Sequence, residues 1–174
     1  MNKKTWAGIL VLIAVEQIIK IIIYYNFLER QFSILPPILY FSPVFNRHYS
    51  WFNSMFHMGI GKGVHIVFVL ILVTFIYLFY RYLNDRAWIN KLINTMFAFL
   101  FSGAVCSLID KVFWDGSLDY VLVKGFFTFD LKDVYINIFN GLLIFSLITD
   151  NKSLKHLDDK QIFKDFIGYI LKKQ

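Results

Sequence analysis

The stretch TWAGILVLIAVEQIIKIIIYY, residues 5–25, decides the fold, because it is apolar almost throughout. About 20 such residues cross the roughly 30 Å hydrocarbon layer of a bilayer as a helix. The run is long, contains Glu16 and Lys20 and lacks a small-residue cleavage site. We therefore expect a retained helix rather than a signal peptide.

Three further apolar runs extend this pattern, at residues 64–80, 89–109 and 134–149. The chain is 57% hydrophobic, with a mean hydropathy of +0.56, whereas a soluble domain is usually about half apolar. Because lipid offers no partner for backbone N–H and C=O groups, each run must be helical. We predict an all-α integral membrane protein, a four-transmembrane-helix bundle whose second and fourth spans are short.

The distribution of positive charge gives the direction of the spans. The net charge of +6 fits Lys and Arg gathered on cytoplasmic segments near anionic lipid better than nucleic-acid binding. Most of these residues lie at the two chain ends and between the second and third runs, so we predict both termini in the cytoplasm. We divide the chain into a four-helix transmembrane domain, residues 1–150, and a cytoplasmic amphipathic tail, residues 151–174, on the inner membrane surface.

Two segments are then predicted to lie outside the membrane. The first, residues 26–63, is too long for a structureless loop, and Phe32–Leu35 and Ile38–Phe41 have the pattern of strands. We expect this segment to form a small extracytoplasmic β-cradle, with a short interfacial helix over Trp51–Met58. The second outer segment concentrates five aspartates, which are Asp110, Asp115, Asp119, Asp130 and Asp133.

Ionisable residues at membrane depth are costly and suggest function. Glu16 and Lys20, four apart on one helix face, either neutralise each other or organise a site. Asp110 ends the third run and Asp133 begins the fourth, so both lie at the outer interface. Two carboxyls in a poorly hydrated place cannot both ionise, which would provide a base and an acid for hydrolysis. The alternative is that both are caps, with Asp133 the N-cap of the fourth helix.

Other kinds of chemistry lack support in the sequence. Cys106 is the only cysteine, which excludes a disulfide framework and a Cys-based metal site. Gly59–Gly63 lacks the spacing and the Ser or Thr of a phosphate-binding loop. His48, His57 and His65 do not follow a zinc-binding pattern. We predict no metal and no cofactor.

Four motifs in chain order resemble those of the lipoprotein signal peptidase family, also called signal peptidase II. The first is Val15–Lys20, which is similar to an acidic residue followed by Gln-x-x-Lys, and the second is Asn46 with Trp51 five positions later. The third is Ser102–Lys111 followed by Leu118–Tyr120, and the fourth is Phe129–Asp133 followed by Ile136. The resemblance extends from the first span through the fourth and leaves out the tail.

The resemblance implies a metal-free aspartic endopeptidase of the bacterial cytoplasmic membrane, with its active site on the extracytoplasmic side. Such an enzyme removes signal peptides from diacylglyceryl-modified prolipoproteins. The implied partners are membrane lipid and the lipid-modified precursor; we expect no nucleic acid and a monomer. By position, the implied catalytic residues are Asp110 and Asp133; the substrate-binding residues are Asn46, Trp51, Lys111, Asp119 and Asp130; and the site-organising residues are Glu16, Lys20 and Ser107.

Several motif positions differ from the family pattern. Cys106 and Ser107 replace Gly-Asn, and Lys111 replaces an arginine that could make bidentate contacts. Asp130 replaces an asparagine and should raise the pKa values of the dyad, whereas Lys132, in place of alanine, would offset that charge. These changes leave an alternative function open, a catalytically weak or inactive paralogue that binds lipidated peptides or a peptide antibiotic.

Overall fold

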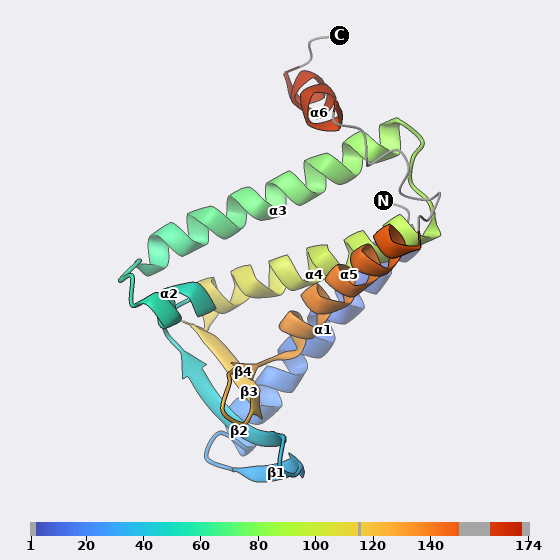
Figure 1. The fold of residues 1–174 in the computed structure, drawn as a ribbon. Coiled ribbons are helices and arrows are strands. Elements are labelled where there is room, and N and C mark those ends of the chain that lie inside the picture. Colours follow the sequence, from blue (N-terminus) through green and yellow to red (C-terminus); the bar gives the residue numbers. More distant parts are fainter. Residues whose placement is uncertain (1–2, 115, 150–160, 172–174) are drawn as a thin grey trace.

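The structure is a computed structural model that describes residues 3–114, 116–149 and 161–171. Within these residues, four helices are long and apolar enough to cross a membrane. They are α1 (Lys3–Asn26), α3 (Lys62–Asp85), α4 (Lys91–Phe113) and α5 (Leu131–Ile148), shown in Figure 1. Large apolar side chains on their outward faces are exposed, as side chains that face lipid must be. The predicted four-helix membrane fold is confirmed.

The lengths of two spans differ from the sequence prediction. α3 has 24 residues, which is about 36 Å at 1.5 Å per residue, because the helix continues through polar residues at both ends. It is therefore longer than the roughly 30 Å layer that it has to cross. α5 has 18 residues, or about 27 Å, and remains short of the roughly 30 Å layer.

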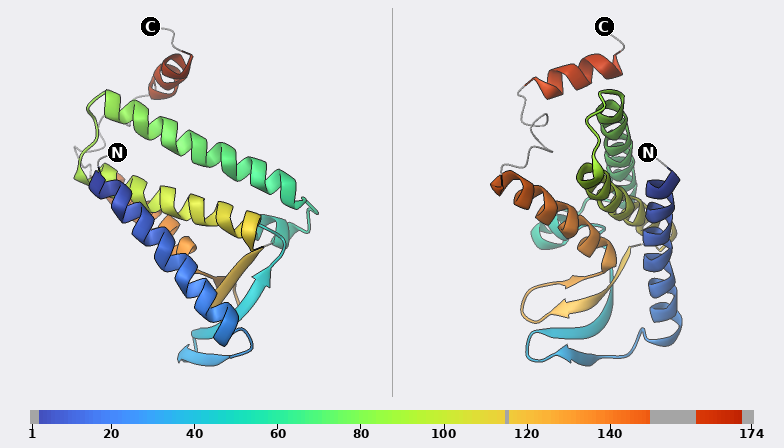
Figure 2. Two further views of the ribbon diagram at one scale, coloured as in Figure 1. Left: turned by 180° about the vertical axis from the view of Figure 1, so that it is seen from behind. Right: turned by 90° about the vertical axis from the view of Figure 1, so that its right-hand side faces the viewer.

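α4 is the central helix of the bundle. It packs against α1, α3 and α5, whereas α3 packs chiefly on α4 and lies apart from α1 and α5 (Figures 1 and 2). Gly103 on α4 faces α5 closely: a Cβ atom there would lie 2.8 Å from Cγ1 of Ile136 and 3.2 Å from the carbonyl oxygen of Lys132. The absence of a side chain at residue 103 therefore lets the start of α5 approach α4.

A four-stranded antiparallel sheet packs beside the helix ends, in the order β1-β2-β3-β4 (Figure 2). The strands are β1 (Phe32–Leu35), β2 (Leu39–Asn46), β3 (Ser117–Val123) and β4 (Thr128–Phe129). The two predicted strands are present, but β2 continues past Phe41 because a bulge there accommodates Pro43. The cradle was predicted within residues 26–63; the sheet also takes β3 and β4 from the second outer segment.

The turn before β3 places that strand against β2. Gly116 has a φ of 149°, and a Cβ atom there would lie 2.9 Å from the carbonyl oxygen of Asn46. Only glycine fits this close approach. The resulting register pairs Ser117 with Asn46 and Asp119 with Val44, which holds two polar side chains of β3 beside the helices.

Two short helices complete the described chain. α2 (Trp51–Phe56) lies within the stretch Trp51–Met58 for which a helix was predicted, and Ser50 caps it by accepting a hydrogen bond from the Asn53 N–H. α6 (Ile162–Ile170) packs on the C-terminal part of α3, where Phe166 meets the rings of Phe75, Phe79 and Tyr82. The tail is thus helical there. Residues 151–160 and 172–174 of the predicted tail lie outside the described residues.

Candidate active site

Four elements bring ionisable side chains together in one place. α1, α4, β3 and the start of α5 contribute Glu16, Lys20, Asp110, Lys111, Asp119, Asp130, Lys132 and Asp133, a set we call the charged cluster. Asp133 is half-buried, and the other members are buried. The cluster has more carboxyl than ammonium groups. Because a buried net charge is costly, some carboxyls must keep their protons.

Lys20 connects α1 to the rest of the charged cluster. Its Nζ lies 2.6 and 2.7 Å from the two carboxylate oxygens of Asp110 and 2.7 Å from Oδ2 of Asp130. Nζ of Lys20 also lies 2.9 Å from Oε1 of Glu16. This contact is an ion pair, but its angles do not meet the geometry of a hydrogen bond. The predicted Glu16–Lys20 pair is therefore present, and the same lysine also holds α4 and the start of α5 against α1.

Lys132 is a second buried cation, carried by α5. Its Nζ donates hydrogen bonds to Oγ of Ser117, at 2.6 Å, and to Oδ2 of Asp130. The same atom lies 3.2 Å from Oδ2 of Asp110 and 3.6 Å from Oδ1 of Asp119. As the sequence predicted, Lys132 offsets the charge of Asp130.

Ser117 links the second cation to a carboxylate. Its hydroxyl accepts from Lys132 and has a single proton to donate. The nearest acceptor is Oδ1 of Asp119 at 2.6 Å, while oxygens of Asp110 and Asp130 lie at 3.1 and 3.3 Å. Ser117 therefore fixes the orientation of Asp119. No sequence pattern indicated this serine, because Lys132, Asp110 and Asp130 reach it from other elements and only Asp119 lies on its own strand.

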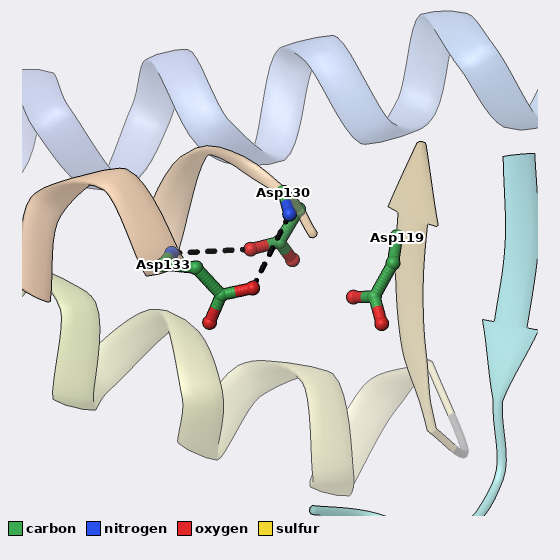
Figure 3. Close-up of side chains that lie close together, drawn as sticks. All are labelled: Asp119, Asp130 and Asp133. Atoms are coloured by element: carbon green, nitrogen blue, oxygen red, sulfur yellow. Dashed lines mark hydrogen bonds between the residues drawn. The ribbon is translucent and has the colours of Figure 1, made fainter. Parts of the chain in front are cut away.

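Asp119, Asp130 and Asp133 meet where β3 faces the start of α5 (Figure 3). One oxygen of each lies within 4.8 Å of the others. Asp130 is the N-cap of α5, and its carboxylate accepts from the Asp133 N–H while that of Asp133 accepts from the Asp130 N–H. This capping box fixes both side chains. The sequence suggested Asp133 as an alternative N-cap of this helix. In the structure the N-cap of α5 is Asp130, three residues earlier.

A cavity of about 660 Å³ lies beside this group, within the usual size range of ligand pockets. The charged cluster lines one side, and apolar residues of α3 and α5 line another. The lining includes Asn46, Tyr49, Ser50, His65, Phe68, Val69, Leu72, Ser107, Lys111, Ser117, Asp119, Phe127, Thr128, Lys132, Asp133, Ile136 and Asn137. Asp119 and Asp133 therefore share the surface of one cavity.

Two carboxyls outside the spans have shifted pKa values. Burial raises the pKa of Asp119, and nearby Asp130 raises it further, against the opposing effects of Lys132 and the Ser117 hydroxyl. Burial acts in the same direction on Asp130, but Lys132 and Lys20 outweigh it and hold the pKa of Asp130 well below its usual range. Asp130 is thus an ionised structural anion, while Asp119 retains its proton to higher pH than an ordinary aspartate.

Asp110 does not occupy the place that the sequence suggested for it. Its carboxylate is fully buried, bound by Lys20, and approached by Lys132 and Ser117. Among the described residues it belongs neither to the three-aspartate group nor to the cavity lining. The carboxyl that lies with Asp133 is Asp119, which was predicted to bind substrate.

The other predicted site residues fall into two groups. Asn46, Lys111 and Ser107 line the cavity; Lys111 donates to Oγ of Ser107 at 2.9 Å, and Oδ1 of Asn46 accepts from the His48 N–H at 3.1 Å. Asp130 was predicted to bind substrate, but it is fully buried in ion pairs and a helix cap.

Two further expectations concern the role of Trp51 and the absence of a metal ion. Trp51 begins α2 beside the cavity-lining Ser50, but its side chain lies outside what the structure describes. The three-aspartate group has the donor atoms of a metal site, yet the ammonium of Lys132 already pairs with Asp130 and Asp119 and offsets part of the negative charge that would attract a cation. We therefore keep the expectation of a metal-free site.

Comparison with known proteins shows what the chain is similar to. The family described as Signal peptidase (SPase) II matches residues 8–149. Over 171 residues the chain is 27% identical to a lipoprotein signal peptidase of Staphylococcus aureus (strain bovine RF122 / ET3-1), covering 92% of this chain and 100% of the relative.

Solved structures agree with the fold. Two chains described as bacterial membrane enzymes, solved in meso at 2.3 and 1.9 Å, align with TM-scores of 0.66 and 0.69. Their identities are 20% and 19%; the alignments cover 86% and 85% of this chain and 90% and 94% of theirs.

Proposed function

Because this chain belongs to the signal peptidase II family of aspartic-type membrane endopeptidases, we propose that it removes the signal peptide from diacylglyceryl-modified prolipoproteins. We assign the catalytic dyad to Asp119 and Asp133. The observation that supports this assignment is that both carboxyls line one cavity and have oxygens within 4.8 Å of each other. That separation suits a single water held between two carboxyls.

The geometry supports a simple hydrolytic sequence. One ionised and one protonated carboxyl share a proton, as the excess of acidic groups in the charged cluster requires. The ionised member takes a proton from the bridging water, whose oxygen attacks the carbonyl carbon of the scissile peptide bond. The other member then gives its proton to the leaving nitrogen. Within the described contacts, Oδ2 of Asp119 and Oδ1 of Asp133 are left for this work.

The rest of the cavity suits a lipidated peptide. Its apolar wall from α3, including Phe68, Val69 and Leu72, matches an apolar signal sequence. Asn46 and Lys111 supply polar contacts for the peptide backbone. The acyl chains stay in the bilayer, so they need not be extracted.

The enzyme belongs in the bacterial cytoplasmic membrane as a multi-pass monomer in contact with lipid. The positive charge at both chain ends supports cytoplasmic termini, and the sheet and dyad then lie on the extracytoplasmic side. This assignment involves no nucleic acid.

Cleavage of a purified diacylglyceryl-modified prolipoprotein, followed by gel shift, tests the function and the dyad together. Asp119→Asn and Asp133→Asn should each lower kcat by at least about 10³-fold while the protein stays folded. Asp110→Asn should keep measurable turnover, because this carboxylate does not line the cavity and reaches the dyad only through Lys132 and Ser117. Full loss with Asp110→Asn and retained turnover with Asp119→Asn would return the dyad to Asp110.

The same assay separates the peptidase from the alternative paralogue. Binding of the lipidated precursor without turnover, at any pH between 5 and 9, would indicate a protein that holds lipidated peptides without cutting them. The full set of dyad, cavity and shared-proton geometry favours turnover.

A further inference from the structure

Lys132 stands out because it is a buried ammonium on the surface of the proposed catalytic cavity. It lies between the N-cap Asp130 and the catalytic Asp133 in the first turn of α5. Only 6% of the residue is exposed, yet it lines the cavity together with Asp119 and Asp133. A buried cation in such a place must be held by specific partners.

Those partners come from each element around the dyad. β3 gives Ser117 at 2.6 Å and Asp119 at 3.6 Å, α4 gives Asp110 at 3.2 Å, and the N-cap of α5 gives Asp130. Among the described ion pairs, Lys132 is the ammonium that reaches Asp119.

The remaining charged groups near the dyad are further engaged. Lys20 and Glu16, from α1, pair with each other, and Lys20 also binds Asp110 and Asp130. Lys111, from α4, donates to Ser107. Lys20 and Lys111 are also near enough to influence the dyad, but among the described ion pairs it is Lys132 that contacts a dyad carboxyl.

We propose that Lys132 is a positioning residue that sets the charge state of the Asp119–Asp133 dyad, with Asp130 as its buried counter-ion. The proposal rests on the proposed function. At the start of α5 an acid and a base, Asp130 and Lys132, stand two residues apart and contact each other. Their contact couples the two charges, because Asp130 is the nearest of the carboxylate partners of Lys132, and loss of Lys132 would leave Asp130 with Lys20 as its remaining cation among the described ion pairs.

The two members of this pair act on the dyad in opposite directions. A nearby cation favours the ionised form of a carboxyl and a nearby anion disfavours it. Lys132 accordingly lowers the pKa of Asp119, and Asp130 raises it, while burial remains the largest effect and raises it. Removal of one charge should therefore move the pH range of activity, whereas removal of both should nearly restore it.

The test is the pH dependence of kcat/KM for prolipoprotein cleavage in four proteins: the native chain, Lys132→Met, Asp130→Asn and the double variant. The native chain should give a bell-shaped profile, because one carboxyl must be ionised and the other protonated. Lys132→Met should shift both limbs of the bell to higher pH by about one unit. Asp130→Asn should shift both limbs to lower pH by a similar amount, and the double variant should return close to the native profile. Lys91→Met, at the far end of α4, is the control and should leave the profile unchanged.

The outcomes separate the inference from the function on which it rests. If the native chain does not cleave, the proposed function fails and the role of Lys132 fails with it. If the native chain cleaves but the variants lose rate equally at every pH, Lys132 only supports packing, and the inference is wrong while the function stands. If Lys132→Met does not fold, Asp130→Asn and the double variant still test the inference. The double variant should lie close to the native profile and Asp130→Asn at lower pH; a double variant whose profile matches that of Asp130→Asn would overturn the inference.

Discussion

Asp130 shows how one residue can serve the helix and the site at once. Its carboxylate caps α5 and also accepts the ammonium groups of Lys20 and Lys132. Because these contacts hold its pKa below that of an unfolded aspartate, ionised Asp130 stabilises the fold above pH 4 or so, and that stabilisation is lost as the pH falls.

Replacement of this residue should therefore affect stability in a pH-dependent way. Asp130→Asn should lower the free energy of unfolding by about 3 kcal/mol at pH 7, because it leaves two buried ammonium groups short of an anion. The difference from the native chain should narrow as the pH is lowered from 5 to 3. Thermal unfolding in detergent across this range measures it; a difference that stays constant with pH would contradict the ionised state of Asp130.

At the scale of elements, the position of Asp133 depends on how closely α5 approaches α4. Gly103→Val should push the first turn of α5 outward, since Ile136 and the backbone of Lys132 already lie against this glycine. A displacement near 1 Å should cost about 10²-fold in kcat, with a smaller change in KM. The control is Gly141→Val on α5, inside a membrane-spanning helix like Gly103, where a new Cβ meets nothing within 4 Å. Equal losses in both variants would mean that helix propensity, not contact, is the cause.

α6 offers a second test at this scale, because its two phenylalanines have opposite environments. Phe166 is 2% exposed among the rings of α3, whereas Phe163 is 64% exposed. Phe166→Ala should release α6 from α3, and hydrogen exchange of the α6 amides should accelerate at least tenfold. Phe163→Ala should leave the exchange unchanged. Similar acceleration in the two variants would show that the docking of α6 does not depend on the buried ring.

For the whole molecule, the prediction that can be tested most directly is orientation. With Cys106, which is buried, replaced by alanine, single cysteines at Lys124 in the β3–β4 turn and Lys164 on α6 report opposite ends. A thiol reagent that cannot cross membranes should label Lys124→Cys in cells with a permeable outer envelope and label Lys164→Cys only after lysis. The reverse pattern would invert the topology.

The sequence predicted more of the fold than of the site. Apolar length suffices to find four spans, because a bilayer imposes both length and helicity. It does not show which acid faces a cavity and which is neutralised by a partner far along the chain. Asp110 lies in the last turn of the third span and Asp119 shortly after it; the contact of Lys20 with Asp110 and the cavity lining by Asp119 separate them only in the folded chain. The strand that carries Asp119 is equally hidden, because β3 is recognised by its pairing with β2.

The ion pairs of Lys20 also bear on how the enzyme is made. Lys20 and its partner Asp110 are 90 residues apart, and Asp130 follows later still. During synthesis, the first helix enters the bilayer with a lysine whose main anions have not yet been translated. A chain halted before its last helix has inserted would have Glu16 and Asp110 as partners of Lys20, but it would lack Asp130, Lys132 and the proposed catalytic Asp133. Maturation into a protease is thereby tied to the completion of its own insertion, and an unfinished copy is an obvious candidate for membrane quality control.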